Sequence, residues 1–126
     1  MKSWETKAID VRARRPEILS STKEARAIAL DLAAGDSLQD HEVHERAWLI
    51  VIAGEVEVTT AAGVTVVGGP GLLVEFDPRE RHQVDALADA RLLLLLTPWP
   101  AAGHPGPMTI EQKADVRRRA AERAKR

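Results

Sequence analysis

The chain has 126 residues, which is enough for one domain with a single hydrophobic core. Its 18 Lys and Arg residues nearly balance its 19 Asp and Glu residues, so no overall charge attracts it to nucleic acid or to an acidic membrane surface. It has no cysteine, which excludes disulfide bonds, thiolate metal sites and cysteine nucleophiles.

The first 22 residues are predicted to form an N-terminal extension. Residues 1–15 are polar and lack the apolar stretch of a secretory signal. The longest apolar runs, residues 47–53 and 92–96, are far shorter than the roughly 20 residues needed to span a bilayer. We therefore expect a cytoplasmic protein with no membrane or nucleic-acid partner.

Residues 23–97 have the pattern of a β-barrel domain. Turn-forming Gly, Pro and Asp residues separate short segments that are rich in Val, Ile, Leu and Thr, as is typical of all-β sandwiches and barrels. The first segment is ambiguous, because residues 23–30 also favour a helix. The predicted strands are residues 25–33, 47–53, 55–60, 64–67, 72–76, 82–86 and 91–97.

Two of these strands, residues 47–53 and 91–97, are apolar on both faces over most of their length. A strand in a small barrel needs only its inward face to be apolar. The outer face is therefore expected to be covered by the N-terminal segment, by a C-terminal helix or by a second subunit. We expect a homodimer in preference to the two intramolecular alternatives.

The C-terminal part divides into a linker and a helix. Residues 98–107 are rich in Pro and Gly, which exclude regular structure. A basic helix is predicted over residues 108–126, with Thr109 as N-cap and Gln112 as its capping-box partner. This helix has seven basic and three acidic residues, so it is either a solvated helix or a contact for a polyanion or a regulatory partner.

Two spaced patterns of glycine and histidine lie within the predicted barrel. Side chains two apart on a strand share a face, so a His-x-His pair supplies two metal ligands from one strand, and a third imidazole comes from a neighbouring strand. The patterns here are Gly35-x5-His41-x-Val43-x3-Ala47-x6-Gly54 and Gly71-x5-Asp77-x-Arg79-x2-His82.

In these intervals the chain resembles the cupin superfamily, as a small single-domain, type-2-like member. The resemblance implies an all-β jelly-roll barrel, here with an N-terminal extension and a short C-terminal helix. Cupin motifs supply two histidines and a glutamate from the first pattern and one histidine from the second. In this chain Val43 stands at the second histidine position and Ala47 at the glutamate position, so only His41 and His82 remain.

Other residues near the first motif could complete a metal site. Glu45 has the same strand parity as His41 and could replace the missing carboxylate, whereas His44 points inward only if the chain is irregular there. One divalent ion (Fe, Mn, Ni or Zn) bound by His41, His82 and either His44 or Glu45 is therefore one alternative. In the others, His41 and His82 contact water or each other, or bind an organic ligand directly.

The preferred functional hypothesis is a small-molecule-binding cupin with a pocket around His41, Val43, Ala47 and His82. The apolar residues Val43 and Ala47 would make this pocket drier than a metal site. The alternative is a metal-dependent enzyme, for which the resemblance implies an oxygenase or an isomerase acting on a small organic substrate. No catalytic residue and no substrate follow from the sequence, because a fold does not define an activity.

Overall fold

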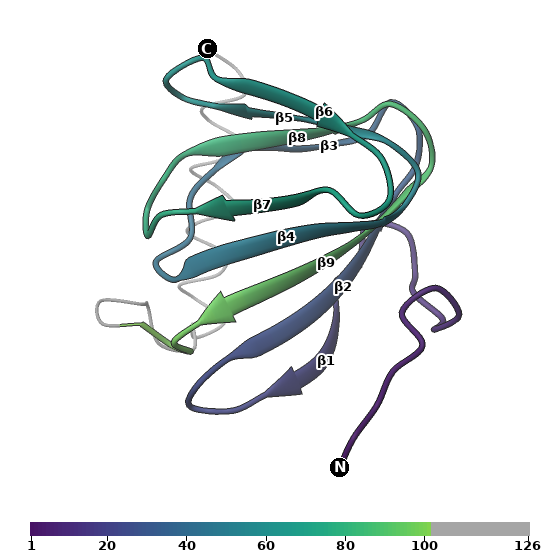
Figure 1. Ribbon diagram of the computed structural model, residues 1–126, viewed down its shortest axis with the longest axis vertical. Helices are drawn as coiled ribbons and strands as arrows, with labels where there is room; N and C mark the ends of the chain where they lie inside the picture. The colour runs from purple at the N-terminus through teal and green to yellow at the C-terminus, as the bar shows by residue number, and fades with distance from the viewer. Residues whose placement is uncertain (102–126) are drawn as a thin grey trace, which may run out of the picture.

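The computed structural model describes residues 1–101, apart from the side chains of Asp40 and His41. Within these residues nine strands form two antiparallel sheets that face each other (Figure 1). One sheet has five strands in the order β1-β2-β9-β4-β7, and the other has four in the order β3-β8-β5-β6. The strands are β1 Glu17–Ser21, β2 Arg26–Leu32, β3 Ser37–His41, β4 Arg46–Ala53, β5 Val56–Thr60, β6 Thr65–Gly68, β7 Leu73–Phe76, β8 His82–Ala86 and β9 Ala90–Thr97.

The all-β prediction is confirmed, and the ambiguous first segment is a strand rather than a helix. This segment, β2, is an interior strand of the five-stranded sheet, paired with β1 and β9, and there backbone pairing and burial outweigh the helical propensity of its Ala and Leu residues. Two strands, β1 and β3, were not expected from the sequence. The predicted C-terminal helix lies outside the described residues.

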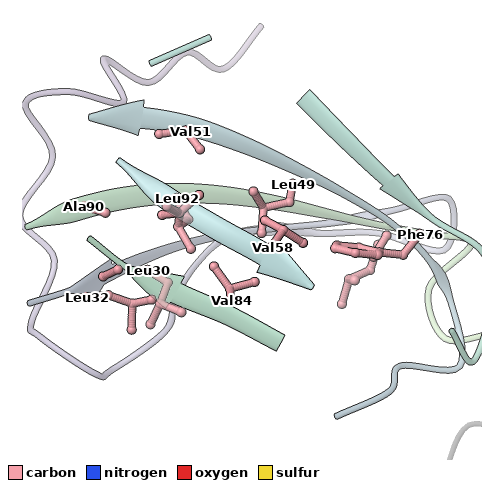
Figure 2. Close-up of a cluster of buried hydrophobic side chains, with 13 residues drawn as sticks. Leu30, Leu32, Leu49, Val51, Val58, Phe76, Val84, Ala90 and Leu92 are labelled. Atoms are coloured by element: carbon pink, nitrogen blue, oxygen red, sulfur yellow. The ribbon is translucent and has the colours of Figure 1, made fainter. Parts of the chain in front are cut away.

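The core lies between the two sheets and is built from the inward positions of each strand. On β4 the buried residues Ala47, Leu49 and Val51 alternate with half-buried Trp48 and Ile50. Figure 2 shows the side chains of the two sheets meeting in one cluster. Its larger members are Leu30, Leu32, Leu49, Val51, Leu92, Leu96 and Phe76 from the five-stranded sheet and Val56, Val58 and Val84 from the four-stranded sheet.

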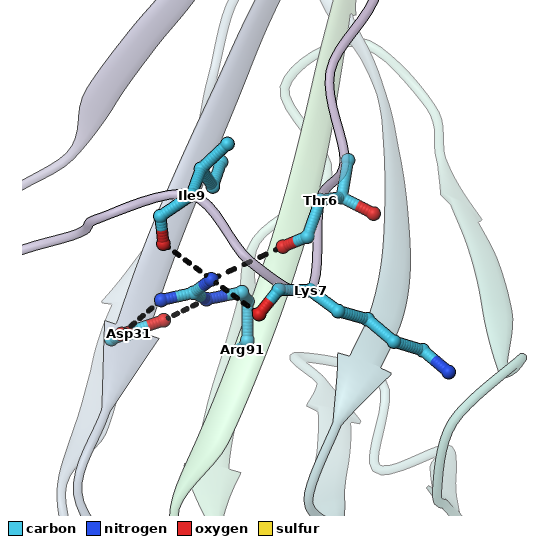
Figure 3. Close-up of polar contacts among 5 residues, drawn as sticks. All are labelled: Thr6, Lys7, Ile9, Asp31 and Arg91. Atoms are coloured by element: carbon cyan, nitrogen blue, oxygen red, sulfur yellow. Dashed lines mark hydrogen bonds and ion pairs between the residues drawn. The ribbon is translucent and has the colours of Figure 1, made fainter.

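The N-terminal segment is bound to the outer face of the five-stranded sheet by one arginine (Figure 3). Arg91 lies directly opposite Asp31 across β9 and β2 and forms a bidentate ion pair with it, at 2.8 and 3.0 Å. The same guanidinium donates to the carbonyl oxygens of Thr6, Lys7 and Ile9 at 3.2, 3.1 and 2.7 Å. The hydrogen bond to Asp31, together with the charges of Asp31 and Asp10, raises the pKa of Arg91. The bonds to the three carbonyl oxygens hold the segment against the barrel.

The outer face of β4 and β9 is apolar over part of its length, as the sequence predicts, and it also carries the ion pair of Arg46 with Glu75. Half-buried Trp48 and Ile50 on β4 lie opposite Leu95 and Leu93 on β9, and all four alternate with core residues. Arg91 and the segment that it binds lie at the opposite end of β9 from Leu95. An apolar strip along β4 and β9 therefore continues beyond the part that Arg91 attaches to the N-terminal segment.

No helix that is long and apolar enough to cross a membrane occurs among residues 1–101.

Candidate functional site

The two motif histidines meet at one end of the barrel, which we call the His82 end. His41 is the last residue of β3 and His82 is the first of β8, and the strand register pairs them directly. At the same end Ala47, near the start of β4, pairs with Phe76, the last residue of β7. The two sequence patterns are therefore brought together across both sheets.

His82 is buried and held in a fixed orientation. Its side chain is 3% exposed, and its ring stacks on the Phe76 ring with a centroid distance of 3.7 Å and an interplanar angle of 10°. Its Nδ1 lies 2.9 Å from the carbonyl oxygen of Glu80, and because a carbonyl can only accept, Nδ1 carries the proton and donates. A neutral ring in this tautomer keeps its lone pair on Nε2.

Glu45 is buried, although residues 42–45 lie outside any strand and the parity argument from His41 therefore does not apply to them. It lies one residue before β4 and two before Ala47, and it is 1% exposed. Its Oε2 accepts a hydrogen bond of 2.9 Å from the backbone N–H of Ala101, in the chain that follows β9. A buried acidic group and a buried imidazole thus belong to the same end of the barrel.

The two positions that depart from the cupin pattern are apolar in the structure as well as in the sequence. Ala47 is 1% exposed and belongs to the core, between Phe76 on β7 and Leu96 on β9. Val43 is half-buried and packs against the same core, and its carbonyl accepts a 2.8 Å hydrogen bond from the Arg79 N–H. Both residues therefore add apolar side chains to the core at the His82 end of the barrel.

The described residues do not fit the metal that the cupin resemblance implies. A divalent ion needs three or four convergent ligands, and neither Val43 nor Ala47 can supply one. Among the side chains that the structure describes, no three His, Cys, Asp or Glu residues come together as a metal-holding group. Glu45 accepts from Ala101 and His44 is half-buried outside any strand, so a metal bound by His41, His82 and one of them stays a prediction.

Three residues of the His82 end were not singled out from the sequence. Phe76 ends an apolar strand, which marks it as core but does not show that it stacks on His82. Trp99 and Ala101 lie in the Pro/Gly-rich segment that was expected to be a linker. In the structure Trp99 packs against the core, and the Arg26 guanidinium lies 3.9 Å from the centre of its ring. No spacing rule in the sequence predicts these contacts.

Two depressions lie away from the His82 end. One, of about 390 Å³, is lined by Lys7, Asp31, Asp89 and Arg91 among small apolar residues, and another, of about 460 Å³, lies between β2 and β3 beside Arg14 and Asp36. Five of their charged residues already bind the protein itself, through the Arg91–Asp31 and Arg14–Asp36 pairs and the Asp89 bond to the Ala34 N–H. These bonds attach chain segments to the barrel.

Solved structures with the same fold are numerous, and all three described here have low sequence identity to this chain. An RmlC-like cupin protein from Desulfovibrio desulfuricans superposes with a TM-score of 0.69 at 20% identity, over 78% of this chain and 97% of that one. An RmlC-like cupin with a double-stranded β-helix fold from Methanocaldococcus jannaschii gives 0.66 at 19% identity, over 78% and 91%. An uncharacterised protein with a double-stranded β-helix domain from Klebsiella pneumoniae gives 0.68 at 15% identity, over 81% and 94%.

These structural similarities establish the fold and do not identify an activity. No curated protein matches the chain. The sequence profile of the family described as "Cupin domain" matches residues 29–98, which is more than half of the chain and includes both motif histidines. The chain belongs to the cupin domain family.

Proposed function

We propose that this cupin binds a small organic molecule at the His82 end of its barrel, at a site that includes His41, Val43, Ala47 and His82, and that it needs no metal ion to do so. The observation that carries the proposal is the buried, oriented imidazole of His82, stacked on Phe76. A ring fixed in this way loses little conformational freedom when it binds a ligand, which favours affinity.

The surroundings of His82 support a ligand rather than a metal. The contact of Nδ1 with the Glu80 carbonyl and the stack on Phe76 fix the orientation of the His82 ring at this end of the barrel. Val43 and Ala47 supply apolar surface where a metal site would have an imidazole and a carboxylate. A few polar groups in an apolar concave site are the usual composition of a small-molecule pocket.

A thermal-shift screen of small organic compounds tests the proposal. A compound present at about 100 times its Kd stabilises the protein by about 2.7 kcal/mol, which raises the Tm of a domain of this size by about 10 °C or more. We expect the shift to disappear in His82→Gln and to persist in Gln83→Ala, which changes the neighbouring residue on the other face of β8. Circular dichroism of each variant checks that it has folded.

A second variant keeps the proposal testable if the His82→Gln protein does not fold. Val43→Leu adds one methylene group at a half-buried position and keeps the apolar character of the site, so it should weaken binding with little effect on the fold. Compounds that stabilise the wild type and both site variants equally would show that they bind elsewhere, and the proposal would then be wrong.

The competing candidate is a metal-dependent oxygenase or isomerase in which His41, His82 and Glu45 or His44 hold one divalent ion. The observation in its favour is that the register pairs His41 with His82 near the buried Glu45. Elemental analysis of untagged protein distinguishes the metal-dependent enzyme from the metal-free binding protein. Stoichiometric Fe, Mn, Ni or Zn that is lost in a His41→Ala, His82→Ala double variant would establish the enzyme hypothesis, and such an ion would also raise the Tm.

A further inference from the structure

We propose that this protein has a second ligand site, which binds a zwitterion of the α-amino acid class between Lys7 and Asp89. The site is the depression of about 390 Å³ described above, which we call the Lys7 pocket. It lies at the other end of the barrel from His82, because its lining includes the last residue of β4 and the first residue of β9. The inference goes beyond the proposed function and does not depend on it.

One wall of the Lys7 pocket is the N-terminal segment. Lys7 and Ala13 line the pocket from this segment, and Leu32, Ala33, Ala53 and Ala90 line it from the barrel. Arg91 holds the segment through three of its carbonyl oxygens, and Ala13 forms a parallel bridge with Asp31. Between these two anchors the side chain of Val11 is buried. The wall is therefore attached at both ends and packed onto the barrel, which fixes the shape of the pocket.

The pocket has four charged residues, and two of them are already paired. Both carboxylate oxygens of Asp31 accept from Arg91. Within residues 1–101 the Lys7 ammonium makes no hydrogen bond or ion pair, and Figure 3 shows its side chain pointing away from Arg91 and Asp31. Asp89 accepts the Ala34 N–H at Oδ1, at 2.9 Å, and in the same part of the chain its Oδ2 accepts no hydrogen bond. One ammonium and one carboxylate oxygen are thus available to a ligand.

These two available groups have opposite charges and do not pair with each other within the described chain. A zwitterion complements both, because its carboxylate accepts from Lys7 while its ammonium donates to Asp89. Each bond is charge-assisted and therefore stronger than a bond between neutral groups. The two basic and two acidic residues of the pocket balance, so a zwitterion leaves its net charge at zero. An amine or a carboxylate alone would leave either Lys7 or Asp89 without a partner.

The rest of the lining indicates the side chain of the amino acid. Apart from the four charged residues it consists of Leu32 and four alanines, each of which contributes only a methyl group. An apolar wall with a few polar groups is the usual composition of a small-molecule site. A short aliphatic side chain therefore suits the pocket better than a polar or charged one.

Calorimetric titration with three probes of related shape tests the charge pattern. L-Leucine carries both charged groups, isoamylamine lacks the carboxylate, and 4-methylpentanoate lacks the ammonium. We expect L-leucine to bind the wild type with a Kd of about 1 mM or below, and about fivefold tighter than either analogue, since each analogue loses one partly exposed charge pair. Nuclear magnetic resonance should show the largest amide shift changes at the lining residues Ala33, Ala53 and Ala90.

Two variants each remove one charge and keep the shape of the side chain. In Lys7→Met the Kd values of L-leucine and isoamylamine should agree within about twofold, because the carboxylate has lost its partner. In Asp89→Asn, which keeps an oxygen for the Ala34 N–H, the Kd values of L-leucine and 4-methylpentanoate should agree to the same degree. Lys2→Met is the matched control, since Lys2 is an exposed lysine of the same segment that does not line the pocket.

The inference is overturned if L-leucine does not bind the wild type at about 10 mM, or if either analogue binds as tightly as L-leucine. It is also overturned if Lys2→Met weakens L-leucine as much as Lys7→Met does. Lys7→Met and the two analogues decide the matter if Asp89→Asn does not fold. His82→Gln should bind L-leucine as the wild type does, and a loss of binding in that variant would place L-leucine at the His82 end and overturn the second site.

Discussion

The stacked pair of Phe76 and His82 links the core of the barrel to the proposed site. Both side chains are buried, and their nearly parallel rings stack with a centroid distance of 3.7 Å, so the pair contributes apolar burial and ring contact together. One face of the imidazole is covered by Phe76, and its Nδ1 donates to Glu80. The same contacts that stabilise this end of the barrel therefore fix the direction of Nε2.

Shortening Phe76 should reduce stability and loosen His82 together. Phe76→Ala leaves a cavity in the core, and we expect the free energy of unfolding to fall by about 3–5 kcal/mol. Phe76→Leu keeps much of the apolar volume and should cost about 1–2 kcal/mol, while still removing the ring stack. Urea denaturation gives both values, and an equal loss in the two variants would contradict a role for the buried volume.

The ion pair of Arg14 and Asp36 predicts a pH dependence of stability. The hydrogen bond from Arg14 lowers the pKa of Asp36 below its ordinary value of 3.8. Because the folded-state pKa is the lower one, the contribution of this pair is present above the unfolded-state pKa and is lost as the pH falls through the folded-state pKa. Wild-type protein should therefore lose more stability between about pH 5 and pH 2 than Arg14→Gln does.

Arg15→Gln is the control for this prediction, since it removes a neighbouring exposed arginine for which the structure gives no ion pair with Asp36. Because the Arg14 side chain is 72% exposed, high salt should reduce the difference between wild type and Arg14→Gln. Urea denaturation curves measured over the pH series provide the free energies. Parallel pH profiles for wild type and Arg14→Gln would show that the pair does not affect folding.

At the scale of the strands, the β4–β5 turn depends on a glycine for two separate reasons. Gly54 has a φ of +82°, and a Cβ there would lie 2.1 Å from the carbonyl oxygen of Asp89 and 2.6 Å from the Cα of Ala90. Gly63, in the β5–β6 turn, has a similar φ of +86° but open space around it. Both glycines therefore have a positive φ that strains other residues, but only at Gly54 would an added Cβ clash with neighbouring backbone.

This contrast predicts different costs for the same substitution. Gly63→Ala should lower the free energy of unfolding by about 1 kcal/mol, from the positive φ alone. Gly54→Ala should lower it by about 3 kcal/mol or more, because the backbone at Asp89 and Ala90 must move to admit the methyl group. Chemical denaturation of both variants measures the difference, and equal costs would contradict the close approach of the two turns.

Most strands could be predicted because their burial alternates and Gly or Pro turns bound them. β1 and β3 could not, for a physical reason. β3 is largely polar, and β1 pairs only with β2 at the edge of its sheet, so backbone pairing, which has no sequence pattern, determines both strands. The edge position of β1 also explains why residues 17–21 were included in the N-terminal extension.

The candidate site, like the strands, could be predicted from the sequence only in part. The motif intervals fix the register, so the pairing of His41 with His82 and the apolar character of Val43 and Ala47 follow from the sequence. The Ala101 bond to Glu45 depends on where the chain after β9 turns back, and tertiary packing decides that. The sequence therefore predicts the pairing of the two motifs and does not predict the contact of Ala101 with Glu45.

For the whole molecule, we propose that a second copy covers the apolar strip of Trp48, Ile50, Leu93 and Leu95. The N-terminal segment is held at Arg91, at the other end of β9 from Leu95, and apolar surface left in water favours association. Light scattering at tens of micromolar should give twice the mass of the chain. Leu93→Lys should give a monomer, because a charge at the centre of such an interface is costly to bury.

Val67→Lys serves as the control, since it places the same charge on β6 in the other sheet, where Val67 is 55% exposed. This variant should remain dimeric. A wild-type protein that is monomeric under these conditions would show that intramolecular contacts cover the strip, and a monomeric Val67→Lys would place the interface on the four-stranded sheet.

Because β2 pairs with β9 and β3 pairs with β8, the barrel cannot close until the last strands have been synthesised. Asp31 and Arg91, which pair across β2 and β9, are 60 residues apart in the chain. The strands synthesised first therefore cannot complete their backbone pairing until the last strands are available. While the ribosome is still synthesising β9, the apolar faces of β2 and β4 have no partner between them. A nascent chain released before this strand is complete is therefore a substrate for chaperones and proteases rather than a smaller barrel.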